Sequence, residues 1–160
     1  MTNPPRANNK DMTTLTERSG FAAAADIRRG VQRLLSCHGV ETISEFCLAN
    51  GRRADVCGVG LDGQLWIVEI KSSISDFRTD QKWPEYRDYC DRLFFAVAPE
   101  FPTEILPADT GLILADRYGG EIIKDAPEFR LSGARRKAVM LQFARVAALR
   151  LQTLLDPQDM

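Results

Sequence analysis

Residues 51–73, Gly-Arg-Arg-Ala-Asp-Val-Cys-Gly-Val-Gly-Leu-Asp-Gly-Gln-Leu-Trp-Ile-Val-Glu-Ile-Lys-Ser-Ser, predict two strands joined by a tight turn at Asp62-Gly63. The second strand carries the only Glu-x-Lys triplet of the chain. Side chains two residues apart in a strand lie on the same face of a sheet. We therefore expect Glu69 and Lys71 to point in one direction, away from the apolar side chains that alternate with them.

The first strand supplies a second carboxylate, Asp55. Alternation places Ala54 and Val56 on the face opposite to Asp55. If the apolar residues of both strands face the core, Asp55 and Glu69 converge on one polar face of the sheet, with Lys71 beside them.

Two carboxylates and an ammonium group held this close are costly, because like charges repel and each group loses contact with water. A divalent metal would remove that cost. The side chains of Asp55 and Glu69 and the main-chain carbonyl of Ile70 are hard oxygen ligands that suit magnesium or manganese, and Lys71 could orient or deprotonate an attacking water. The residues alone leave open a simpler alternative, an exposed hairpin with one weak Glu–Lys ion pair.

The combination of Asp55 with Glu69-Ile-Lys71 resembles the PD-(D/E)XK signature of restriction-endonuclease-like nucleases. A wider resemblance, to the bacterial MmcB-like family of DNA-repair endonucleases, rests on four segments: Gly51–Asp55, Val68–Ser73, Asp76–Arg78 and Lys82–Asp91. One departure is Ala54, which occupies the place of the proline in the signature. That proline binds no metal, so its loss leaves the expected chemistry intact.

The resemblance implies a metal-dependent nuclease that hydrolyses phosphodiester bonds in DNA, with magnesium or manganese as cofactor. It assigns Asp55 and Glu69 to the metal and Lys71 to the water. Many nucleases with this signature carry a Gln or a Lys on the helix after the motif, which makes Gln81 and Lys82 further candidates. The expected partners are DNA and other DNA-repair proteins.

Four more residues are candidates because of their places along the chain. Arg53, Arg78 and Tyr86 lie near enough to the motif in sequence to contact a nucleic-acid substrate. Glu45 lies on the strand that precedes the Asp55 strand, where it would be either a third metal ligand or a charge at the rim.

The order of expected elements predicts an α/β protein, specifically a three-layer α/β/α restriction-endonuclease-like fold with a mixed central sheet. We expect a flexible tail over residues 1–16 and a single nuclease-like domain over residues 17–160. The expected elements are a helix over 19–37, a strand over 41–48, two strands within 51–73 on either side of the turn at Asp62-Gly63, a polar loop over 72–79, a helix over 80–90, a strand over 92–98, a hairpin over 111–124 and a helix over 132–155.

Composition narrows the class of protein. The chain has 160 residues and a formal net charge of −1. Any surface that binds nucleic acid would therefore have to be a local patch of positive charge. The four cysteines and one histidine show no zinc-binding spacing. No signal peptide or apolar run of about 20 residues is evident, so we expect a cytoplasmic protein that does not enter a membrane.

Two other functions stay open at this point. The chain could be a non-catalytic nucleic-acid-binding module of a repair complex that keeps the nuclease fold. A glycosidase-type pair of carboxylates is less suited, because the adjacent lysine would keep both groups ionised. Oligomeric state is also open, and the apolar final helix could support a homodimer.

Overall fold

The computed structural model describes residues 9–157. In chain order the elements are α1 (Asn9–Cys37), β1 (Val40–Cys47), β2 (Arg53–Gly60), β3 (Leu65–Lys71), α2 (Ile74–Thr79), the 3-10 helix η1 (Trp83–Tyr89), β4 (Arg92–Val97), the 3-10 helix η2 (Thr103–Ile105), β5 (Gly111–Ala115), β6 (Gly120–Lys124) and α3 (Gly133–Leu155).

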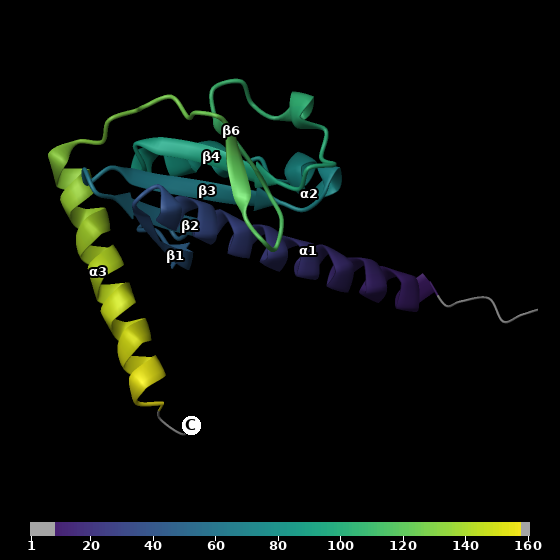
Figure 1. Cartoon of the computed structure of the whole chain (residues 1–160), viewed down its shortest axis with the longest axis horizontal. Coiled ribbons are helices and arrows are strands. Elements are labelled where there is room, and N and C mark those ends of the chain that lie inside the picture. The colour runs from purple at the N-terminus through teal and green to yellow at the C-terminus, as the bar shows by residue number, and fades with distance from the viewer. Residues whose placement is uncertain (1–8, 158–160) are drawn as a thin grey trace, which may run out of the picture.

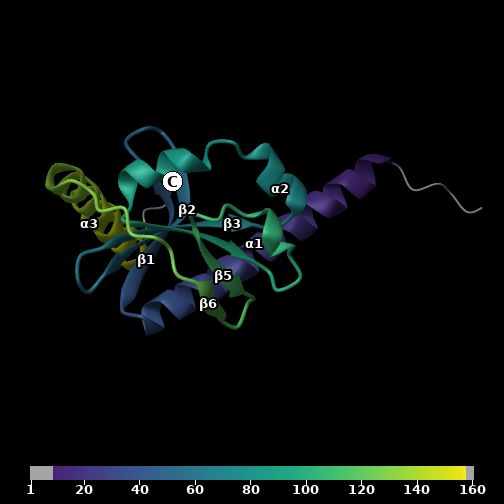
Figure 2. The same ribbon diagram turned by 90° about the horizontal axis from the view of Figure 1, so that it is seen from above.

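The strands form one six-stranded sheet in the order β1-β2-β3-β4-β5-β6. Its first three strands are antiparallel, β3, β4 and β5 are parallel, and β6 is antiparallel to β5. The parallel β3–β4 pair requires a crossover, which α2 and η1 provide. This arrangement confirms the predicted α/β fold with a mixed sheet between helical layers (Figures 1 and 2).

Helices cover both faces of the sheet. On one face α1 packs its buried residues Ile27, Val31 and Leu35 against the central strands. On the other face η1 and the start of α3 cover a second cluster, to which Tyr86 and Val139 belong. The strands are therefore buried on both sides, which is typical of sheets with crossover helices.

This double burial corrects one expectation, that Asp55 and Glu69 share a polar face. Cys57 and Ile67, which continue the same face along the strands, are fully buried. Ala54 and Val56 also belong to different clusters. The alternation fails across from Glu45 of the neighbouring strand, whose positive φ of 52° departs from extended strand geometry.

The boundary of the predicted tail was also wrong. Residues 9–16 form the first turns of α1, whereas residues 1–8 lie outside the described residues. No proline or glycine occurs in this stretch, and its polar residues each lower helix propensity by less than about 1 kcal/mol. A helix already docked on the sheet can extend through such residues because propagation is much easier than nucleation.

Two local elements differ from expectation after β3. The predicted loop over 72–79 contains α2, whose N-cap Ser73 accepts a hydrogen bond from the main-chain N–H of Asp76 at 3.0 Å. The predicted helix over 80–90 is the 3-10 helix η1, which begins only at Trp83. Pro84 explains the late start, because a proline fits the first turn of a helix but not its interior.

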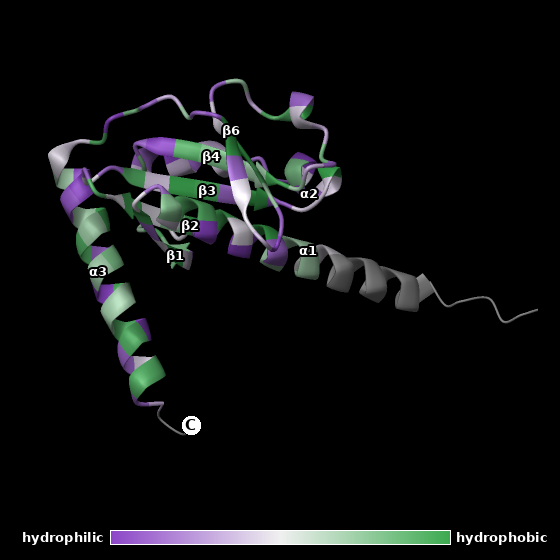
Figure 3. Cartoon of the chain, viewed as in Figure 1, coloured by the Kyte–Doolittle hydropathy of each residue, from purple (hydrophilic) through white to green (hydrophobic). Residues whose placement is uncertain are grey.

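The final helix begins after Ser132 as predicted, with the Ser132 side chain accepting from the main-chain N–H of Arg135. Its apolar residues were expected to cover the sheet, but Val139 is the one residue of α3 that is fully buried. The helix leaves the sheet and projects from the domain (Figure 1), and its free part carries many apolar residues (Figure 3).

Candidate functional site

The candidate site lies where β2 and β3 diverge. Their paired residues run from Val59–Leu65 to Val56–Val68 and stop there. Beyond that point side chains replace the main-chain ladder. The N–H of Asp55 donates to Oε1 of Glu69 at 3.2 Å, and the N–H of Ile70 donates to Oδ2 of Asp55 at 2.8 Å. The two carboxylates are thus fixed in the gap between the strands, as the sequence predicted.

This gap opens into a cleft of about 490 Å³, a size that suits a small ligand or a segment of a polymer. The cleft is bounded by α1, the β1–β2–β3 edge, α2 and η1. Its lining contains five carboxylates and five cations: Glu45, Asp55, Glu69, Asp76 and Asp80, with Arg28, Arg52, Arg53, Lys71 and Lys82.

The Glu69 carboxyl is 3% exposed, and burial followed by repulsion from Asp55 raises its pKa to about 9. Burial also raises the pKa of Asp55, although the N–H of Ile70 and the charge of Lys71 oppose the shift. Within residues 9–157 neither carboxylate forms an ion pair. The site therefore holds two carboxyl groups close together that no described cation contacts.

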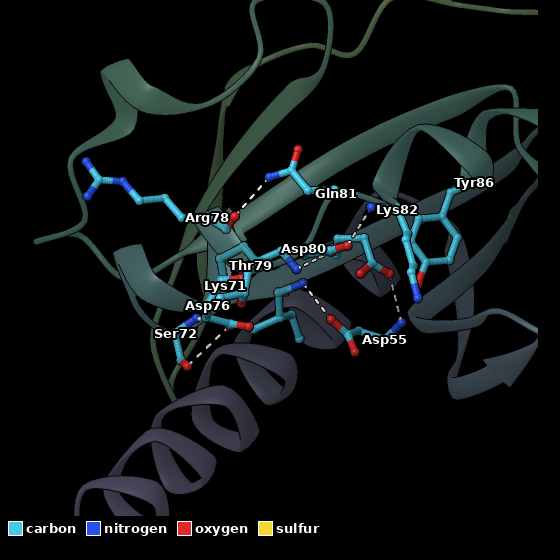
Figure 4. A network of polar contacts seen from close by, with 12 residues as sticks. Asp55, Lys71, Ser72, Asp76, Arg78, Thr79, Asp80, Gln81, Lys82 and Tyr86 are labelled. Atoms are coloured by element: carbon cyan, nitrogen blue, oxygen red, sulfur yellow. Dashed lines mark hydrogen bonds and ion pairs between the residues drawn. The ribbon is translucent and has the colours of Figure 1, made fainter.

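Lys71 is 4% exposed, and its Nζ lies 2.6 Å from Oδ2 of Asp80 (Figure 4). The other oxygen of Asp80 accepts the N–H of Lys82 at 3.0 Å. Burial disfavours the charged lysine, but the hydrogen bond and the charge of Asp80 outweigh it, so the pKa of Lys71 is raised. Sequence reasoning missed Asp80, because only the path of α2 brings it back over the end of β3.

Glu45 lines the cleft, and the pairing of its strand neighbours places it across from Asp55. Both of its oxygens are engaged: Oε1 lies 3.1 Å from Nη1 of Arg28 and Oε2 lies 2.7 Å from Nε of Arg53. Its main-chain carbonyl also accepts from Arg150 of α3. In this arrangement the Glu45 carboxylate is held by two guanidinium groups at the edge of the cleft, as in the rim-charge alternative.

The structure divides the remaining candidates into two groups. Lys82, Tyr86 and Arg53 line the cleft, although Tyr86 is buried and its hydroxyl donates to the carbonyl of Arg53 at 3.0 Å. Gln81 and Arg78 are exposed and do not line it. The Gln81 amide donates to the carbonyl of Arg78 at 2.9 Å and points away from Asp55 (Figure 4).

The donor set suits a hard divalent cation. Among the described residues no group of three or more His, Cys, Asp or Glu side chains is arranged to hold a metal. Two carboxylates are available, because no described donor bonds to Oδ1 of Asp55 or Oε2 of Glu69, and Ile70 lines the same cleft. Magnesium is commonly bound by one or two carboxylates, with water and substrate phosphate completing the shell. The residues present therefore fit that ion.

Comparisons with known proteins connect the chain to a family of DNA repair proteins. A family model described as DNA repair protein MmcB-like matches residues 11–158. Among solved structures the chain is similar to the SPO1766 protein of Silicibacter pomeroyi, described as of unknown function, with 48% sequence identity and a TM-score of 0.83 over 86% of this chain and 94% of that chain. No curated protein matches the chain significantly.

Proposed function

Because the chain belongs to the MmcB-like family of DNA repair proteins, we propose that it is a metal-dependent DNA nuclease, and specifically an endonuclease, that acts in repair. One observation carries the proposal: the half-buried Asp55 and the buried Glu69 lie side by side without an ion-pair partner, next to a buried lysine. Such an arrangement is unfavourable in a purely structural role, because buried carboxylates normally have partners.

In this proposal Asp55, Glu69 and the carbonyl of Ile70 hold magnesium or manganese. The bound ion would supply Lewis-acid stabilisation of the charge that develops on the phosphoryl oxygens during in-line attack by water. The open side of the cleft would admit the phosphodiester. The fixed hydrogen bonds from the N–H groups of Asp55 and Ile70 orient the two carboxylates in advance, so little reorganisation is needed on binding.

Lys71 would act directly on the reacting groups. Its ammonium is positively charged through its contact with Asp80, so it is suited to orienting water and stabilising negative charge rather than to accepting a proton. Asp80 is then a positioning residue, because its carboxylate holds the lysine ammonium at 2.6 Å. Lys82 and Arg53, on the same cleft, would contact the substrate phosphates.

The test is cleavage of labelled single-stranded, duplex, nicked and branched DNA with magnesium or manganese. We expect metal-dependent cutting by the wild type and loss of cutting in Glu69→Gln and Asp55→Asn. Glu121→Gln, on the exposed strand β6, is the matched control and should cut normally. Activity that survives in both site variants would refute the proposal.

The second candidate is a non-catalytic nucleic-acid-binding module. It is favoured by the close Lys71–Asp80 contact, which occupies the lysine, and by the small number of ligating side chains. This function predicts salt-dependent DNA binding without cleavage of any substrate in the panel.

A further inference from the structure

Helix α3 exposes more large apolar side chains than any other described element. Of the eleven large apolar side chains exposed in the described residues, six lie on this helix: Met140, Leu141, Leu149, Leu151, Leu154 and Leu155. Exposed apolar side chains that cluster in this way mark interaction surfaces. Figure 3 shows hydrophobic stretches, in green, along the portion of α3 that projects beyond the sheet.

The helix carries two distinct apolar stripes. The inner stripe, Val139, Phe143 and Val146, packs against the domain. The outer stripe consists of Met140, Ala144, Ala148, Leu151 and Leu155, all exposed. These positions follow the i, i+4, i+8, i+11, i+15 pattern of a single helix face, and between Met140 and Leu155 that face carries no charge. A second stripe that the domain leaves bare requires another partner.

We propose that this partner is a second copy of the chain, and that the protein forms a homodimer through antiparallel pairing of the two α3 helices. The outer stripe is self-complementary about its centre. A two-fold axis between Ala147 and Ala148 sets Met140 against Leu155 of the other copy and Ala144 against Leu151. Large side chains thus meet large ones at the ends, and alanines allow close approach at the centre.

The charges of α3 favour the antiparallel direction. The helix contains no acidic residue, and its first turns hold Arg135, Arg136 and Lys137. Parallel pairing would place these cations beside each other. Antiparallel pairing places Lys137 near the C-terminal carbonyls and Asp156 of the other copy, where a cation is favourable. At 23 residues the helix is about 35 Å long, enough for an extended interface.

A membrane is the competing occupant. Among the described helices α3 is the one that is long and apolar enough to cross a bilayer by length and composition. A helix buried between two copies of a soluble protein meets the same two criteria. The membrane alternative does not explain the symmetry of the outer stripe, so we retain the second copy as the occupant. The inference does not depend on the nuclease activity.

Analytical ultracentrifugation of the full chain over a range of concentrations tests the proposal. We expect a dimer for the wild type and an increase of about a hundredfold or more in the dissociation constant for Leu151→Glu, which buries a charge in the interface. The matched control is Leu149→Glu. Leu149 is 63% exposed and Leu151 is 58% exposed, but Leu149 lies off the outer stripe, so its variant should remain dimeric. Circular dichroism checks that both variants fold.

Cysteine cross-linking tests the direction of pairing, in a background in which the exposed Cys37 and Cys47 are replaced by serine. An equal mixture of the M140C and L155C proteins should form a disulfide-linked heterodimer, whereas each protein alone should stay unlinked. A chain that is monomeric at all concentrations overturns the proposal, whether or not it sediments with phosphatidylglycerol vesicles. Equal dissociation of the Leu149→Glu and Leu151→Glu variants also overturns it.

Discussion

The two ends of strand β3 each hold buried carboxylates, but in opposite states. At the C-terminal end, burial raises the pKa of Glu69 to about 9. At the N-terminal end the Asp91 side chain is fully buried at 0% exposure, yet its pKa is lowered. Burial alone raises the pKa of both groups, so the partners must account for the difference.

Asp91 has every partner that a buried carboxylate needs. Its oxygens accept the N–H groups of Leu65 at 2.8 Å and Leu131 at 2.9 Å. Arg136 of α3 adds two further bonds at 2.6 and 2.7 Å. These bonds join the start of α3 to the sheet. The Asp55–Glu69 end has one described main-chain bond to each carboxylate and no ion pair. The comparison shows that this fold can satisfy a buried carboxylate fully and leaves one pair unsatisfied at the cleft.

The largest expected effect is on stability, and it concerns Asp91 at the N-terminal end of β3, where the carboxylate has all its partners. Asp91→Ala removes four bonds and leaves the Arg136 guanidinium and two main-chain N–H groups without their partner. We expect a loss of about 3–5 kcal/mol in the free energy of unfolding, as for other broken buried pairs. Urea denaturation measures this loss. A loss below about 1 kcal/mol would show that the two ends do not differ as argued.

The same experiment at the cleft should give the opposite result. Glu69→Gln replaces a carboxyl group that has no cation partner and whose raised pKa favours its uncharged form, so we expect an unfolding free energy within about 1 kcal/mol of wild type. Cleavage should nevertheless fall by about a thousandfold or more, because an amide would hold the metal ion poorly and the ion is what stabilises the charge of the transition state. Stopped cleavage in a variant that is as stable as wild type separates function from structure. A large loss of stability would place Glu69 among the structural carboxylates.

A metal ion should stabilise the folded chain only through the Asp55–Glu69 site at the cleft. An ion that binds the folded chain raises its stability by about 2.7 kcal/mol when present at a hundred times its dissociation constant. We expect magnesium or manganese to raise the melting temperature of the wild type and of Asp91→Asn. The Glu69→Gln variant should show no such rise. An equal rise in that variant would indicate that the ion binds elsewhere.

The pH dependence of stability should also separate the two ends, in protein freed of metal with a chelator. The pKa of Asp91 is lower in the folded than in the unfolded chain, so its contribution is full above about pH 4 and is lost as pH falls through the folded pKa. The pKa of Glu69 is raised from 4.5 to about 9, so folding becomes less favourable as pH rises across that interval. Melting curves from pH 3 to about 10 should show both arms. Asp91→Asn should flatten the acid arm, and Glu69→Gln the alkaline arm.

The sequence predicted the Asp55–Glu69 site at the cleft better than it predicted the Asp91–Arg136 contact at the other end of β3. The turn at Asp62-Gly63 was enough to bring Asp55, Glu69 and Lys71 together, because it places their strands side by side, although the predicted alternation fails at Asp55. Asp91 and Arg136 are separated by the whole β4–β6 region, so only the fold reveals their contact. The contact between Asp80 and Lys71 was not predicted for a related reason: a loop was expected over residues 72–79, where α2 turns the chain back toward β3. Gln81 was misplaced because η1 starts later than the expected helix.

The smallest expected effect concerns DNA binding, and it compares one cation from each end. Lys82 lines the cleft, whereas Arg135 lies at the start of α3 with its guanidinium 4.6 Å from the Tyr89 ring. Loss of one phosphate contact should weaken DNA binding by about 1 kcal/mol. It should also reduce the slope of the logarithm of the binding constant against the logarithm of the salt concentration by roughly 1. We expect this change for Lys82→Ala, measured by fluorescence anisotropy in the Glu69→Gln background, which prevents cleavage. Arg135→Ala should bind as the background does. If both variants weaken binding equally, the DNA path extends across η1 to the satisfied end, and that end would serve substrate binding as well as stability.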